Sequence, residues 1–115
     1  MEIRHTKTHN AAILAVQGRM DATSAPIFDQ QMAQVLADGT TYCIVNCSQL
    51  EYISSAGLRS TLTAAKANRS QGGDLVFVGL QGAVHEVFEI AGFSTMFQVF
   101  ASEEAALETR PNRQP

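Results

Sequence analysis

The segment Glu51–Ser60, EYISSAGLRS, places two adjacent hydroxyl side chains, Ser54 and Ser55, directly after an apolar stretch. The residues from Leu58 onward have the spacing of an amphipathic helix, so both serines are expected at or beside its N-cap. Capping alone would stabilise the helix by about 1 kcal/mol relative to alanine. An exposed hydroxyl there can also accept a phosphate, which would meet free N–H groups and the positive end of the helix dipole.

Few other residues suggest chemistry. The sequence has no phosphate-binding glycine loop with a lysine, no G-x-S-x-G elbow and no C-x-x-C pair. The histidines His5, His9 and His85 lack the spacing of a metal site, and structural or solvated roles are predicted for them. Cys43 and Cys47 would lie about 13 Å apart on an extended strand, too far for a disulfide, and are predicted to be buried free thiols. We therefore expect a protein that is not an enzyme and holds no metal or cofactor.

Composition narrows the class of protein further. The 115 residues are 45% hydrophobic and 17% charged, which is typical of one soluble globular domain. The net charge of −3 and the dispersed basic residues argue against a nucleic-acid partner. No apolar run approaches the roughly 20 residues that span a bilayer, and the N-terminus lacks the apolar region of a signal peptide. A cytoplasmic protein with no membrane partner is expected.

Hydrophobic periodicity and turn residues predict nine elements along the chain. Strands and helices alternate after an initial pair of strands, which are joined by a turn at His9–Asn10. The predicted strands are 1–8, 11–18, 40–47, 74–80 and 96–100. The predicted helices lie within 20–39, from Ser54–Leu58 to the turn at 70–73, within 83–93 and within 102–110.

Three details of these elements are specific enough to test. Gly18 is expected to end the second strand. Ser24 or Thr23 is expected to cap the first helix, whose apolar stripe is Phe28, Met32, Val35 and Leu36. In the second helix, the apolar seam is expected to consist of Leu58, Leu62 and Ala65.

The alternation of strands and helices predicts the fold class. Parallel strands joined by right-handed helical crossovers follow from such an order, and the N-terminal hairpin adds an antiparallel pair. The expected fold is α/β, with a single domain and a mixed sheet, in the order β-β-α-β-α-β-α-β-α. Residues 1–108 are expected to form the domain and 109–115 a flexible C-terminal tail.

Several segments occur in the order found in one known family. They are GRMD at 18–21, SSAGL at 54–58 after an apolar strand, a Gly72–Gly73 turn, FEIAG at 88–92 and EEAAL at 103–107. Together these segments, spread over about residues 10–108, resemble the STAS domain of bacterial anti-sigma factor antagonists. No single motif among them is decisive, but the ordered set is specific.

The resemblance implies a binding module in a partner-switching pathway. In that family, the unphosphorylated protein binds an anti-sigma factor that is also a serine kinase of the histidine-kinase-like ATPase type. Phosphorylation of one serine releases the complex, and a metal-dependent serine phosphatase resets it. The acceptor falls on Ser55, and the loop at Asp21 is similar to the region that contacts the partner. The implied partner-binding residues are Asp21, Ser54, Ser55, Ala56, Gly57 and Leu58.

One residue departs from the family pattern. Ser54 stands where many members have aspartate, which removes a negative charge and provides a second possible acceptor. The acceptor is therefore expected to be Ser55, with Ser54 as the alternative. The same departure favours a second hypothesis, a constitutive scaffold or transport-complex subunit without phosphorylation. A third hypothesis, a small hydrolase that uses Ser55, lacks a nearby base in the sequence.

Overall fold

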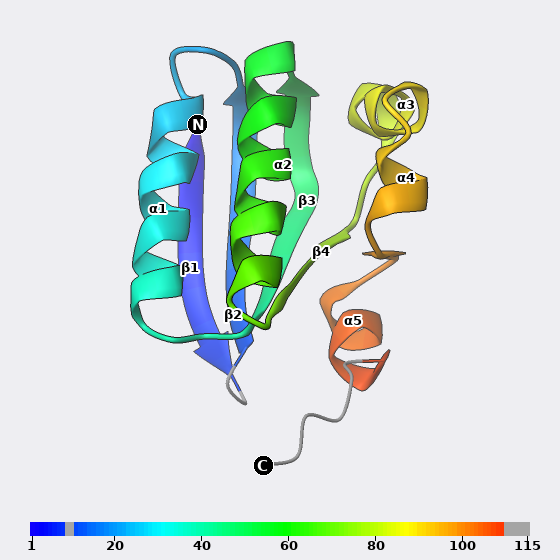
Figure 1. The fold of residues 1–115 in the computed structure, drawn as a ribbon. Coiled ribbons are helices and arrows are strands. Elements are labelled where there is room, and N and C mark those ends of the chain that lie inside the picture. The colour runs from blue at the N-terminus through cyan, green and yellow to red at the C-terminus, as the bar shows by residue number, and fades with distance from the viewer. Residues whose placement is uncertain (9–10, 110–115) are drawn as a thin grey trace.

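The computed structural model describes residues 1–8 and 11–109 (Figure 1). Ten elements follow one another along the chain. They are β1 (Glu2–Thr8), β2 (Ala11–Met20), α1 (Ala25–Ala37), β3 (Tyr42–Ile53), α2 (Ser55–Ser70), β4 (Asp74–Val78), α3 (Gly82–Ile90), α4 (Phe93–Met96), β5 (Val99–Phe100) and α5 (Glu103–Thr109).

The five strands form one sheet in the order β1-β2-β3-β4-β5. β1 pairs antiparallel with β2, and the other neighbours pair parallel, so the predicted mixed sheet with an N-terminal hairpin is confirmed. The predicted turn at His9–Asn10 and residues 110–115 of the predicted tail lie outside the described residues. Thr109, assigned to that tail, is the last residue of α5.

Helices cover the two faces of the sheet unequally. Figure 1 shows α1 and α2 side by side across one face. Alternate residues of β2 and β3 on that face pack with α1 to α4, and the largest members of this core include Phe28, Phe77 and Phe88. A smaller core on the other face joins the sheet to Ala106 of α5, whose carbonyl accepts a hydrogen bond of 2.9 Å from the Tyr42 hydroxyl.

The predicted end of β2 at Gly18 is wrong, because the strand continues to Met20. Gly18 has a φ of +98°, a conformation that glycine adopts without steric cost, and the register with β3 shifts between Gly18 and Arg19. The irregular strand extends the β2–β3 pairing to Ile53, where the chain turns into α2. The bulge therefore places the end of β2 beside the start of α2.

The predicted apolar seam of α2 is also only partly correct. Ala65 is buried, but Leu58 and Leu62 are half-buried at its margin. The buried face consists mainly of small side chains: Gly57, Ser60, Thr61, Ala64, Ala65 and Asn68. Small residues let the helix lie close to the sheet, an arrangement that a search for large apolar residues overlooks.

The C-terminal third differs from the predicted order by one element. The short helix α4 occupies part of the stretch predicted as a strand, and only Val99 and Phe100 form β5. Phe93 and Phe97 from this region pack edge-on with a ring centroid distance of 5.2 Å, and both are buried. The two rings thus belong to the core on the α1 and α2 face of the sheet.

Cys43 and Cys47 are buried free thiols, as predicted. Burial raises the pKa of each thiol to about 12. Both groups are thus protonated at neutral pH and are poor nucleophiles. They contribute to the core and not to a reactive site.

Candidate functional site

The two serines at the start of α2 have different environments. Ser54 is the N-cap, with extended backbone, and its Oγ accepts a hydrogen bond of 3.2 Å from the Gly57 N–H. Ser55 is the first helical residue and is exposed. Among the described residues, no hydrogen bond engages its hydroxyl. Ser54 therefore performs the capping role, which leaves the Ser55 hydroxyl free and accessible to solvent.

Close backbone contact fixes the start of α2 to the end of β2. The Ser54 N–H donates a hydrogen bond of 2.9 Å to the Met20 carbonyl. A Cβ atom at Gly57 would lie 2.7 Å from Ile53 Cγ1 and 2.9 Å from the Met20 carbonyl oxygen. Glycine is the residue that lets the first turn of α2 pack at this distance, and Gly57 itself is buried.

The loop between β2 and α1 is organised by Asp21. Its Oδ1 accepts hydrogen bonds of 3.1 Å from the backbone N–H groups of Thr23 and Ser24 and from the Ser24 hydroxyl. The bonds from Ser24, backbone first and hydroxyl second, hold the pKa of the Asp21 carboxyl below its ordinary value. The ionised carboxylate thus shapes the loop, and the residue stays half-exposed at the surface.

Ser24 occupies the predicted N-cap position of α1 but does not cap the helix with its side chain. Its single hydroxyl proton is shared between the Arg19 carbonyl, at 2.8 Å, and the Asp21 carboxylate, at 3.1 Å, and its oxygen accepts a hydrogen bond of 2.9 Å from the Asp21 N–H. Ser24 is buried, and it connects the loop to the last residues of β2. The predicted N-cap position is therefore correct, but the Ser24 side chain does not bind the backbone N–H groups of α1.

The structure brings the predicted partner-binding residues together. The loop at Asp21 and the turn at Ser54 meet through the Met20–Ser54 backbone bond. Of the remaining members, Ser55 is exposed, Ala56 and Leu58 are half-buried, and Gly57 is buried beneath them. The exposed part of this set therefore centres on Ser55, and the Asp21 loop is joined to the same turn through Met20 and Ser54.

A cation–π pair near the serine turn was not predicted from the sequence. The Arg19 guanidinium carbon lies 4.1 Å from the ring centroid of Tyr52, and the two residues are partners in the β2–β3 register. Tyr52 is 37% exposed, which is high for a large side chain in this protein. The pairing depends on the bulge near Gly18, and the sequence carries no signal for it.

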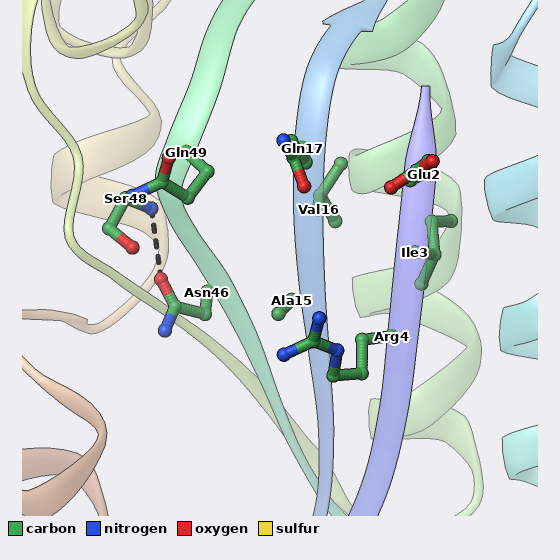
Figure 2. A pocket seen from close by; sticks show the side chains of 9 residues that line it. All are labelled: Glu2, Ile3, Arg4, Ala15, Val16, Gln17, Asn46, Ser48 and Gln49. Atoms are coloured by element: carbon green, nitrogen blue, oxygen red, sulfur yellow. Dashed lines mark hydrogen bonds between the residues drawn. The ribbon is translucent and has the colours of Figure 1, made fainter.

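A hollow of about 410 Å³ lies elsewhere, on the sheet face opposite α1 and α2 (Figure 2). Its floor includes Ala15, and Arg4, Gln17 and Gln49 surround it. The amide oxygen of Asn46 there accepts a bond of 2.9 Å from the Ser48 N–H. None of the predicted site residues lines this hollow.

Within residues 1–8 and 11–109, no three His, Cys, Asp or Glu side chains gather as a metal site would require. No helix in these ranges has the length and apolar character needed to cross a bilayer.

The different roles of the serines predict different stabilities on mutation. Ser54→Ala removes the cap at Gly57 and should lower the free energy of unfolding by about 1 kcal/mol. Ser55→Ala is the matched control, because it removes an exposed hydroxyl that has no hydrogen-bond partner among the described residues. It should change the free energy of unfolding by less than about 0.5 kcal/mol. Urea unfolding followed by circular dichroism measures both. Equal losses would contradict the assignment of Ser54 as the cap.

The amino-acid sequence matches a protein-family model. Residues 2–106 match the model of the STAS domain. The chain therefore belongs to the STAS domain family.

Individual relatives are consistent with this assignment. The chain is 37% identical over 106 residues to the Bordetella bronchiseptica protein BtrV, assigned to the anti-sigma factor antagonists, covering 92% of this chain and 91% of BtrV. An anti-sigma factor antagonist from Mycobacterium paratuberculosis has the same fold, with a TM-score of 0.85, 20% identity and coverage of 93% and 91%. The Bacillus cell fate determinant SpoIIAA in its phosphorylated form superposes with a TM-score of 0.74 at 17% identity, covering 93% and 97%.

Proposed function

We propose that this protein is an anti-sigma factor antagonist whose partner binding is switched off by phosphorylation of Ser55. One observation carries the proposal: an exposed, unbonded hydroxyl stands at the first residue of α2, directly after a serine that is already engaged as the cap. The names of the similar proteins support the class of function.

The difference between the serines supports Ser55 over Ser54 as the acceptor. Phosphorylation of Ser54 would have to break or rearrange its bond to Gly57, and its side chain is less exposed. Ser55 offers its hydroxyl without loss of a bond in the described structure. A kinase can therefore reach Ser55 without disturbing the start of the helix.

The position also explains how a phosphate would act as a switch. A phosphoserine carries about −1.5 to −2 charges at neutral pH. At the first residue of α2 this charge lies near the positive end of the helix dipole, so the free domain tolerates it. A partner packed against the neutral surface of Ser55 and Ala56 would have to bury the same charge, which is unfavourable without a compensating cation.

The resemblance to the family supplies the expected partners. They are an anti-sigma factor that is a serine kinase of the histidine-kinase-like ATPase type, and a serine phosphatase that reverses the modification. SpoIIAA, which shares the fold, is known in a phosphorylated form. We propose that the protein acts in the cytoplasm through these protein partners, without catalysis of its own and without nucleic acid or membrane.

The proposal is tested by capture followed by phosphorylation. Immobilised Ser55→Ala protein should retain a kinase from a lysate of the source cells, because the variant cannot be released by phosphorylation. That kinase with ATP should add one phosphate to the wild-type protein and to Ser54→Ala, and none to Ser55→Ala, by intact mass spectrometry. Full phosphorylation of Ser55→Ala would overturn the site, and retention of no kinase would overturn the switch.

A second candidate is a constitutive scaffold or a subunit of a transport complex. The observation that favours it is Ser54, a neutral residue where many members of the family carry aspartate. Unmodified mass in protein isolated from both growing and stressed cells would support it. The hydrolase hypothesis gains no support, since no histidine hydrogen-bonds Ser55 among the described residues.

A further inference from the structure

The exposed face of α2 is cationic. Arg59, Lys66 and Arg69 are exposed on this helix, and its sequence SAGLRSTLTAAKANRS contains no acidic residue. This concentration is unusual in a chain whose net charge is −3. Ser55 lies on the same exposed face, at the N-terminal end of the helix.

Arg59 is the cation positioned closest to Ser55 along the helix. Residues four apart lie about 6 Å apart along the axis and about 40° apart around it, so their side chains are neighbours. An anion at the first position and a cation at the fifth is the favourable orientation of such a pair. Lys66 shares the face but lies three turns from Ser55, beyond the reach of a direct contact.

The Arg59 guanidinium is available for a new partner. Arg59 lines the groove between α1 and α2, which Asp29 of α1 also lines. In the part of the chain that the structure describes, Arg59 forms no ion pair; the pairs found join Lys7 with Asp38 and His85 with Glu89. A phosphate on Ser55 would therefore not need to displace a carboxylate from it.

We propose that Arg59 binds the phosphate on Ser55 and holds it against the surface of α2. The inference rests on the proposed function, because it concerns the modified form of that site. Guanidinium groups bind phosphate oxygens with two parallel hydrogen bonds, a geometry that lysine does not reproduce. Arg59 is thus a positioning residue that stabilises the dianionic phosphate and keeps it at the surface that a partner would cover.

The test places phosphoserine at position 55 by genetic code expansion and titrates its second ionisation by ³¹P NMR in about 0.1 M salt, where a Debye length of about 10 Å screens the more distant charges. The phosphate pKa, ordinarily about 6, should rise by about 0.3 unit when Arg59→Gln removes the cation, because the dianion loses a favourable pair. Lys66→Gln, the matched control, should leave it unchanged within error. Arg59→Lys should retain part of the effect, since the charge remains while the planar geometry is lost.

Two outcomes would overturn the inference. One is an unchanged phosphate pKa in Arg59→Gln; the other is an equal rise in Arg59→Gln and Lys66→Gln, which would indicate only a diffuse field. Both residues are exposed, so the unphosphorylated variants should unfold at the wild-type midpoint. The phosphate is installed without a kinase, so failure of a kinase to modify Ser55 would reject the proposed function and leave this titration unaffected.

Discussion

Protein phosphorylated on Ser55 is expected to bind its anti-sigma factor partner at least about 100-fold more weakly than the unmodified protein. Covering the phosphate would remove a dianion from water; one guanidinium neutralises only part of its charge, and burying the remaining charge costs several kcal/mol, with tenfold in affinity for each 1.4 kcal/mol. Ser55→Ala should bind like the unmodified protein. Ser55→Glu, with one charge, should be weakened about tenfold or more. Isothermal titration calorimetry with the captured kinase measures all four forms.

A matched control separates local from general electrostatic effects. Ser70 is exposed at the far end of α2, so Ser70→Glu adds the same charge to the same helix away from the site. Its affinity should stay within about threefold of the wild type, since exposed charges beyond a Debye length of about 10 Å are largely screened. Equal dissociation constants for Ser55→Ala and Ser55→Glu would contradict the switch. Equal weakening by Ser55→Glu and Ser70→Glu would contradict its location.

The second large effect is expected at Gly57, where two physical effects oppose each other. Helix propensity alone predicts that Gly57→Ala stabilises a helix by about 1 kcal/mol. The new Cβ, however, would lie 2.9 Å from the Met20 carbonyl oxygen, a backbone atom that cannot easily move, and 2.7 Å from Ile53 Cγ1. Overpacking costs about 1 to 3 kcal/mol, so after the gain in propensity we expect a net loss of up to about 2 kcal/mol in chemical unfolding.

Gly82→Ala is the comparison for this substitution. Gly82 has a φ of +56° and no atom within 4 Å of a built Cβ, so alanine there meets backbone strain without a clash. The expected loss is about 1 to 2 kcal/mol, and partner binding should be unaffected. Gly57→Ala should also weaken partner binding, because the start of α2 must shift away from Met20. A gain in stability for Gly57→Ala would show that this packing is looser than described.

Much of the architecture could be predicted because it depends on local patterns. Continuous apolar runs such as 75–78 in β4 indicated strands covered on both faces, and turn residues marked most boundaries. The errors occur where tertiary contacts override local signals. Gly18 resembles a strand end but lies within β2 at a register shift, and Met96, predicted to begin the last strand, ends the short helix α4 instead.

The site shows the same division between local and tertiary information. The order of residues around Ser54 and Ser55 was sufficient to predict a capped helix start with an accessible hydroxyl, because N-capping is a local interaction. It could not assign the cap to one serine, since that depends on which Oγ reaches the Gly57 N–H. Nor could it reveal that Ser24 bonds to Arg19 and Asp21 instead of capping α1.

The amino-acid sequence by itself therefore determined the alternation of strands and helices, the helix-start position of the two serines and the family to which the segments are similar. These features depend on neighbours within a few residues, which the sequence lists directly. The tertiary structure alone decided which serine hydroxyl caps α2, and which backbone groups of its loop Asp21 binds. It also decided that Met20 and Ile53 pack against Gly57. Those properties come from contacts between β2, β3 and α2, whose geometry exists only after the sheet has paired and the helix has packed upon it.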